Sequence, residues 1–195
     1  MRIVQGAAML LVVAMVTTSA PASLSAQQGQ PVNAYGAAVK EFRDRTAAYL
    51  AVQKKAAGTV PALKETDDPT KLTAREVALG EAIRQARAGA KAGDVFGTDL
   101  APRIRDIIKK DWAKRSAADR AGLAEDIPSG TLADVNATYP SALPLATFPA
   151  TLLAALPPLP EDLEYRFVGR HLILRDVKAN IIVDVLTNVL PGART

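Results

Sequence analysis

Apolar residues recur at helical spacing through the first half of the chain that follows residue 31. Between Val32 and about Ala57 they alternate with charged residues, which predicts an amphipathic helix. The apolar positions of this helix are Tyr35, Val39, Phe42, Tyr49 and Leu50. A second helix is predicted from Thr73 to about Ala92, because "TARE" at its start fits a capping box and Gly93 fits a helix end.

A third helix is predicted in "PRIRDIIKKDWAKR", with Pro102 in its first turn. One face of this helix carries Ile104, Ile107, Ile108 and Trp112, and charged residues occupy the other face. The following stretch, "SAADRAGLAEDIPSG", is compatible with one more short helix.

Helical periodicity then gives way to alternation in "LADVNATY", which predicts a half-buried strand with one apolar face. The apolar positions are Ala133, Val135, Ala137 and Tyr139. The proline-rich segment that follows is expected to be ordered and packed on the sheet. Pro149 can begin a short helix that contains Leu152, Leu153 and Leu156. A flexible linker is the alternative for this segment.

The stretch "LEYRFVGRHLILRD" predicts a hairpin with Gly169 and Arg170 as the two central turn residues. A type II′ turn needs positive φ at its first central residue, which glycine adopts without strain. In this register Val168 faces His171, and Glu164 faces Arg175 as a cross-strand ion pair. The two strands then share one wholly apolar face.

"KANIIVDVLTNVL" predicts a third strand after a turn at Ala179 and Asn180, because asparagine tolerates the left-handed conformation. If this turn also has two central residues, Asp184 falls opposite Arg175. A helix over Ile181 to Leu190 is the alternative. The predicted class is α+β, with about three N-terminal helices followed by a small antiparallel β-meander at the C-terminus.

The first 26 residues fit a secretory signal peptide, because Arg2 precedes a short apolar run and a small-residue segment. Cleavage is expected after Ala26, with Ala22 as the alternative. The run is too short to span a bilayer, so no stable membrane span is expected after cleavage. The domains expected are a signal peptide at 1–26, a helical region at 27–126, and the proline-rich segment and meander at 127–195, packed as one domain with the helices. The expected location is periplasmic or secreted.

Charge is concentrated in the third predicted helix. Arg2 is the only charged residue before position 27, so the rest of the chain carries 23 basic and 20 acidic residues, a net charge of +3. Residues 103–115 alone carry six basic and two acidic residues. The candidate binding patch is Arg105, Lys109 and Lys110, and the expected partner is a protein or an anionic envelope component. A solvated outer face is the alternative, and no nucleic acid is expected.

Candidate catalytic chemistry is sparse. His171 is the only histidine and no cysteine is present, so zinc ligands of the usual kinds are lacking and no cofactor or metal is expected. Ser116, Ser129 and Ser141 are not in a nucleophile elbow, and neither "ETDDPT" nor "GDVFGTD" follows the calcium-loop pattern. The function expected is therefore a non-catalytic interaction protein. An acid-dependent hydrolase is the alternative, and its candidate carboxylate pairs are Asp94 with Asp99 and Glu161 with Asp162.

The block "LPEDLEYRFVGRHLILRDVKANIIVDVL", with "GDVF" and "VNATYP" before it, resembles a recurrent group of exported bacterial proteins of unassigned function. The likeness spans most of the chain after residue 26 and implies export without a mechanism. The final part is also similar to the C-terminal β-meander of RcnB-type periplasmic proteins, which are associated with nickel and cobalt homeostasis. That likeness implies an accessory role in metal homeostasis as a further alternative. Those proteins usually have glycine where Asn180 stands here, and no metal-binding residue carries over.

Overall fold

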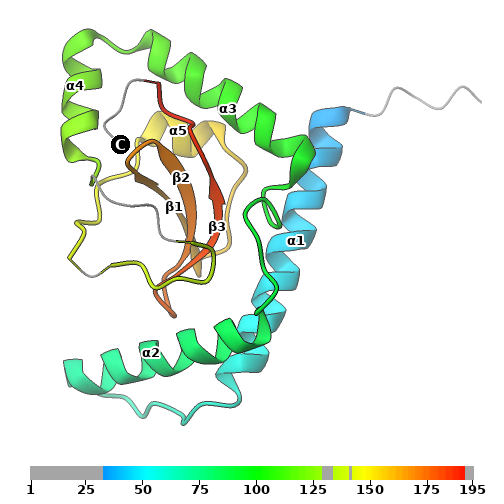
Figure 1. Cartoon of the computed structure of the whole chain (residues 1–195), viewed down its shortest axis with the longest axis vertical. Coiled ribbons are helices and arrows are strands. Elements are labelled where there is room, and N and C mark those ends of the chain that lie inside the picture. The colour runs from blue at the N-terminus through cyan, green and yellow to red at the C-terminus, as the bar shows by residue number, and fades with distance from the viewer. Residues whose placement is uncertain (1–32, 129–133, 141, 192–195) are drawn as a thin grey trace, which may run out of the picture. The chain divides into compact units, whose positions relative to one another are not determined.

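The computed structural model describes residues 33–128, 134–140 and 142–191, and the leader expected at 1–26 lies outside these residues. The helices are α1 (Ala34–Ala57), α2 (Pro69–Ala86), α3 (Gly97–Lys114), α4 (Ala117–Asp126) and α5 (Ala150–Ala155), and the strands are β1 (Leu163–Val168), β2 (His171–Asp176) and β3 (Ile181–Leu186) (Figure 1). The α+β class, with helices followed by an antiparallel sheet, is confirmed. The described residues form five helices where about three were expected.

The strands form one antiparallel sheet in the order β1-β2-β3. The predicted hairpin register is confirmed, since Val168 pairs with His171 and Glu164 with Arg175. Gly169 has φ 53°, while Arg170 is not among the residues with positive φ, as a type II′ turn requires. The sequence after the hairpin forms a strand and not the alternative helix.

The second turn of the meander differs from the sequence-based expectation. Four residues, 177–180, connect β2 to β3, and Asn180 is left-handed with φ 49°. The longer turn and an irregularity between Leu174 and Arg175 shift the register, so Asp184 pairs with Leu174 and not with Arg175. This one-position difference decides which way Asp184 points, because neighbouring strand residues face opposite sides of a sheet.

The hairpin turn gives a stability prediction. Valine at this glycine position would have to adopt the left-handed conformation, which is strained for a β-branched residue. We expect Gly169→Val to lower the free energy of unfolding by about 1 to 3 kcal/mol in urea melts. His171→Ala is the control, because among the residues that the structure describes its side chain accepts a single long hydrogen bond, 3.3 Å, from the Asn188 amide. A Gly169→Val variant as stable as the wild type would refute the structural role of this glycine.

Two helix boundaries differ from those predicted. Helix α2 begins at Pro69, because the Asp68 side chain accepts the Thr70 amide at 3.0 Å and a proline at the first position needs no acceptor. Thr73 therefore lies inside the helix, and the predicted capping box there is wrong. The helix ends at Ala86 and not near Ala92.

Helix α3 begins before its predicted start. Its first residue is Gly97, so Pro102 lies inside the helix and not in its first turn. The amide that Pro102 lacks would have bonded the carbonyl of Thr98, a residue exposed to solvent. A capping box between Ser116 and Asp119 then begins α4, the short helix for which the sequence left room.

The segment "LADVNATY" does not form the predicted strand. Its described part forms one isolated bridge, Thr138 opposite Ile181, and the backbone hydrogen bonds around it join the segment to the edge of the sheet. Ala133 lies outside the described residues. Asn136 has φ 69° and exchanges side-chain hydrogen bonds with Arg87, which turns the chain. The expected short helix after Pro149 is confirmed as α5.

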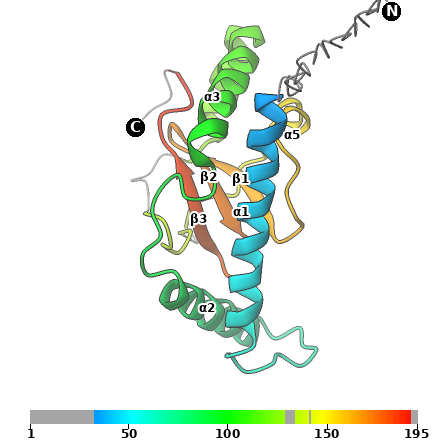
Figure 2. The ribbon, with the colours of Figure 1, turned by 90° about the vertical axis from the view of Figure 1, so that its right-hand side faces the viewer.

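One hydrophobic core joins the helices to the first face of the sheet. Phe42 of α1 stacks on Phe96, and Ile104 and Ile108 of α3 are fully buried in the same cluster. Ile107 and Trp112 are partly buried against it, as the sequence predicted for this face. The other sheet face holds a smaller cluster, made of Tyr139, Val168, Ile173, Ile182 and Val185. Figure 2 shows α1 in front of the sheet, with α3 beside its N-terminal half and α2 at its C-terminal end.

Candidate functional site

Two acidic residues of the sheet, Asp184 in β3 and Asp176 in β2, are fully buried. The Asp184 carboxylate accepts four backbone N–H groups, from Gly93 at 2.6 Å, Phe96 and Val185 at 2.7 Å, and Val95 at 2.8 Å. Burial raises the pKa of Asp184, and the four N–H donors oppose this rise. The side chain fixes the loop before α3 onto the sheet.

Asp176, at the end of β2, fixes α1 onto the sheet. Its Oδ2 accepts the Tyr49 hydroxyl at 2.6 Å and the Gln53 amide at 2.8 Å, and its Oδ1 accepts the backbone amides of Lys178 and Ala179. Burial, with the adjacent Asp176 carboxylate, strongly raises the pKa of the Tyr49 phenol. Asp176 is thus a buried structural anchor between α1 and the second turn.

The predicted Glu164–Arg175 pair is present and belongs to a larger network. Arg175 donates to Glu164 at 2.6 Å and to the Asn180 side chain at 2.7 and 2.9 Å, and it lies over the Tyr139 ring. Burial works to raise the pKa of Glu164, but hydrogen bonds and charge from Arg166 and Arg175 outweigh it and hold the pKa below its usual value. Asn180 therefore serves both the turn and this network.

Two of the four carboxylates proposed for a hydrolase, Asp94 and Asp162, have other partners, and Glu161 is exposed. Asp94 accepts the Lys91 amide at 2.8 Å, Asp162 forms an ion pair with Lys178 at 2.8 Å, and Asp99 lies in the first turn of α3. Within the described ranges, no three His, Cys, Asp or Glu side chains gather as a metal site would require.

The serine candidates give no nucleophile arrangement in the part of the chain that can be described. Ser116 caps α4, while Ser129 and Ser141 lie outside the described residues. His171 is half-buried, and burial together with nearby Arg170 lowers its pKa.

The predicted basic patch lies on α3, but its three residues are not equally exposed. Lys109 and Lys110 are exposed. Arg105 is half-buried and donates to the carbonyl of Thr187.

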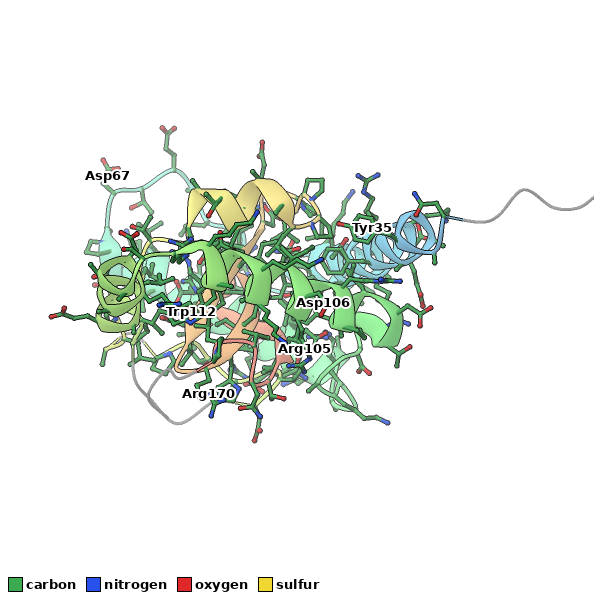
Figure 3. The ribbon with its side chains drawn as sticks, turned by 90° about the horizontal axis from the view of Figure 1, so that it is seen from above. Tyr35, Asp67, Arg105, Asp106, Trp112 and Arg170 are labelled. Carbon is green, nitrogen blue, oxygen red and sulfur yellow. The ribbon has the colours of Figure 1, made fainter. Side chains whose placement is uncertain are left out.

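Arg105 thus helps to hold the segment after β3. The backbone carbonyl of Arg170 accepts the amides of Val189 and Leu190 from the same segment. Figure 3 shows Arg105 and Arg170 on the same side of the molecule. The guanidinium of Arg105 is therefore a structural contact beside the exposed cations.

Four exposed cations lie on the outer side of α3, and we call them the α3 cationic face: Arg103, Lys109, Lys110 and Lys114. Within the described residues none of the four forms an ion pair, whereas Arg115 at the end of the helix pairs with Asp111 at 2.6 Å. These side chains are available to an anionic surface.

A second surface feature was not predicted from the sequence. A groove of about 730 Å³ lies where the C-terminal half of α1, the loop 58–68 and α2 meet the second turn. Its apolar wall includes Leu50, Leu63, Leu72 and Leu79, of which Leu63 and Leu72 remain 39% and 47% exposed. We call it the α1–α2 groove.

A comparison with protein-family models, with curated proteins and with solved structures finds no match to this chain. None of the helices in the described ranges is both long enough and apolar enough to cross a membrane.

Proposed function

We propose that this protein is exported to the periplasm or secreted, and that it binds an anionic component of the cell envelope through the α3 cationic face. The observation that carries the proposal is the set of exposed cations on α3 without an ion-pair partner among the described residues. The wider chain after residue 26 has a net charge of only +3, so the helix provides a local cationic surface on a nearly neutral protein.

The charged residues of the sheet are less suited to binding a partner than the α3 cationic face. Asp176, Asp184 and Arg175 are buried and occupied by internal hydrogen bonds. Exposed lysines, in contrast, retain full hydrogen-bonding capacity toward phosphate or carboxylate groups. No observation in the described residues favours the hydrolase or the metal-homeostasis alternative, and we do not propose either.

Export rests on the leader pattern of Arg2, the short apolar run and the small residues before Gln27. We expect N-terminal sequencing of protein recovered from the envelope fraction to begin at Gln27, or at Ser23 if cleavage follows Ala22. Recovery of the intact Met1 terminus from that fraction would contradict a cleaved leader.

The binding surface is tested by replacing Lys109, Lys110 and Lys114 with glutamine together. A basic residue near an anionic surface contributes about 1 kcal/mol to binding, so the triple variant should bind anionic envelope material roughly 100-fold more weakly. Folding should be almost unchanged, because exposed charges contribute little to stability. Arg105 is left intact since it holds Thr187.

The matched control replaces Lys55, Lys64 and Lys91 with glutamine. These lysines are exposed, belong to segments other than α3 and form no ion pair among the described residues, so the control removes the same charge elsewhere. Equal weakening by both variants would show that net charge alone matters. Retention of binding by the α3 variant would reject the α3 face as the binding surface.

A further inference from the structure

The α1–α2 groove has an apolar wall that no described segment covers. Leu50 and Ala57 come from α1, Leu63 from the connecting loop, and Leu72 and Leu79 from α2. Its volume, about 730 Å³, falls within the range of about 300 to 1,000 Å³ typical of small-molecule sites. The groove lies at the C-terminal end of α1, whereas α3 packs beside its N-terminal half (Figure 2). It is therefore a separate surface from the α3 cationic face.

Some polar groups of the groove already form hydrogen bonds or ion pairs, and others do not. The Gln53 amide is bonded to Asp176, and Asp162 is paired with Lys178. The charged groups left in the wall are Lys54, Arg75 and Glu76, none of which forms an ion pair among the described residues. Their sum is one positive charge, which matches a ligand with one negative charge.

Arg75 supplies the most specific feature of the groove. Its Nη2 donates to the carbonyl of Ala57 at 3.3 Å, which places the guanidinium against the C-terminal end of α1. Its Nη1 is buried and has no acceptor among the described residues. A buried cationic donor without an acceptor is unfavourable, and a carboxylate is the acceptor that a guanidinium pairs with best.

We propose that the α1–α2 groove binds a single-chain amphiphile that ends in a carboxylate, such as a free fatty acid. The alkyl chain lies against the leucines of the wall, and the carboxylate pairs with the positive charges of Arg75 and Lys54. This site goes beyond envelope binding through α3, because it involves different residues and a different ligand.

The test is calorimetric titration of the purified protein with decanoate and with 1-decanol, which has the same chain length but no charge. Decanoate should bind about tenfold or more tightly than decanol, as expected for one charge-assisted hydrogen bond. Arg75→Gln should reduce this preference to about threefold or less, while Arg75→Lys should retain part of it. Equal binding of both probes to the wild type, or binding of neither, would overturn the proposal.

The apolar wall is tested with two substitutions on the same helix. Leu72→Gln should weaken both probes by about tenfold, because it places an amide in the wall. Val77→Gln is the matched control, since Val77 is 56% exposed on α2 and does not line the groove. Equal effects of the two substitutions would place the probes elsewhere and reject the groove. Thermal melts establish that each variant is folded, and unchanged vesicle binding by the Arg75 variants separates this site from the α3 face.

Discussion

Asp184→Asn is expected to be the most destabilising single substitution among the polar residues, lowering the free energy of unfolding by about 4 kcal/mol. The four partners of this carboxylate are all backbone N–H groups, which can only donate. An asparagine side chain has an NH2 group in place of one carboxylate oxygen, and this group would face backbone N–H groups that need an acceptor. No rotation of the side chain relieves this conflict, because donors approach both oxygens.

Urea unfolding of the variant measures the effect. The control is Asp106→Asn on the exposed side of α3, which should change the free energy of unfolding by no more than about 0.5 kcal/mol. A loss below about 1 kcal/mol for Asp184→Asn would mean that the loop before α3 does not depend on this carboxylate.

Asp176 should behave differently although it is equally buried. Asp176→Ala should lower the free energy of unfolding by about 3 kcal/mol, since it leaves several buried donors without an acceptor. Asp176→Asn should cost only about 1 kcal/mol, because the partners of Oδ2 are side chains that can reverse. The Tyr49 hydroxyl can accept a hydrogen bond, and the Gln53 amide can present its oxygen.

Comparison of the two substitutions by urea unfolding is the measurement. If the asparagine variant were as unstable as the alanine variant, the negative charge of Asp176 would be the essential property, and the exchange of hydrogen bonds proposed for Tyr49 and Gln53 would be wrong.

The hairpin could be predicted from the sequence because its determinants are local. Gly169 supplies the positive φ and the flanking residues alternate in polarity, so register and turn follow from fourteen consecutive residues. The end of α2 and the start of α3 could not be predicted in the same way. The loop before α3 bonds Asp184, about ninety residues further along the chain, and Arg87 after α2 bonds Asn136 and Val183.

The candidate sites also divide into local and tertiary features. The sequence placed Lys109 and Lys110 correctly on an exposed helix face, because helical periodicity alone decides it. It gave no reason to separate Arg105 from them, since the contact with Thr187 is tertiary. The α1–α2 groove arises only when α1, the loop and α2 pack together. The sequence indicates it only through two leucines, Leu63 and Leu72, in an otherwise polar stretch, and their exposure is visible only in the structure.

The most direct test of envelope binding through α3 is cosedimentation of the wild-type protein with phosphatidylglycerol vesicles and with phosphatidylcholine vesicles. We expect binding to the anionic vesicles at 0.1 M salt, with little binding to the neutral ones. Raising the salt to 1 M should release the protein, because the Debye length falls from about 10 Å to about 3 Å. Equal binding to both vesicle types, or binding that persists at 1 M salt, would contradict an electrostatic role of the α3 cationic face.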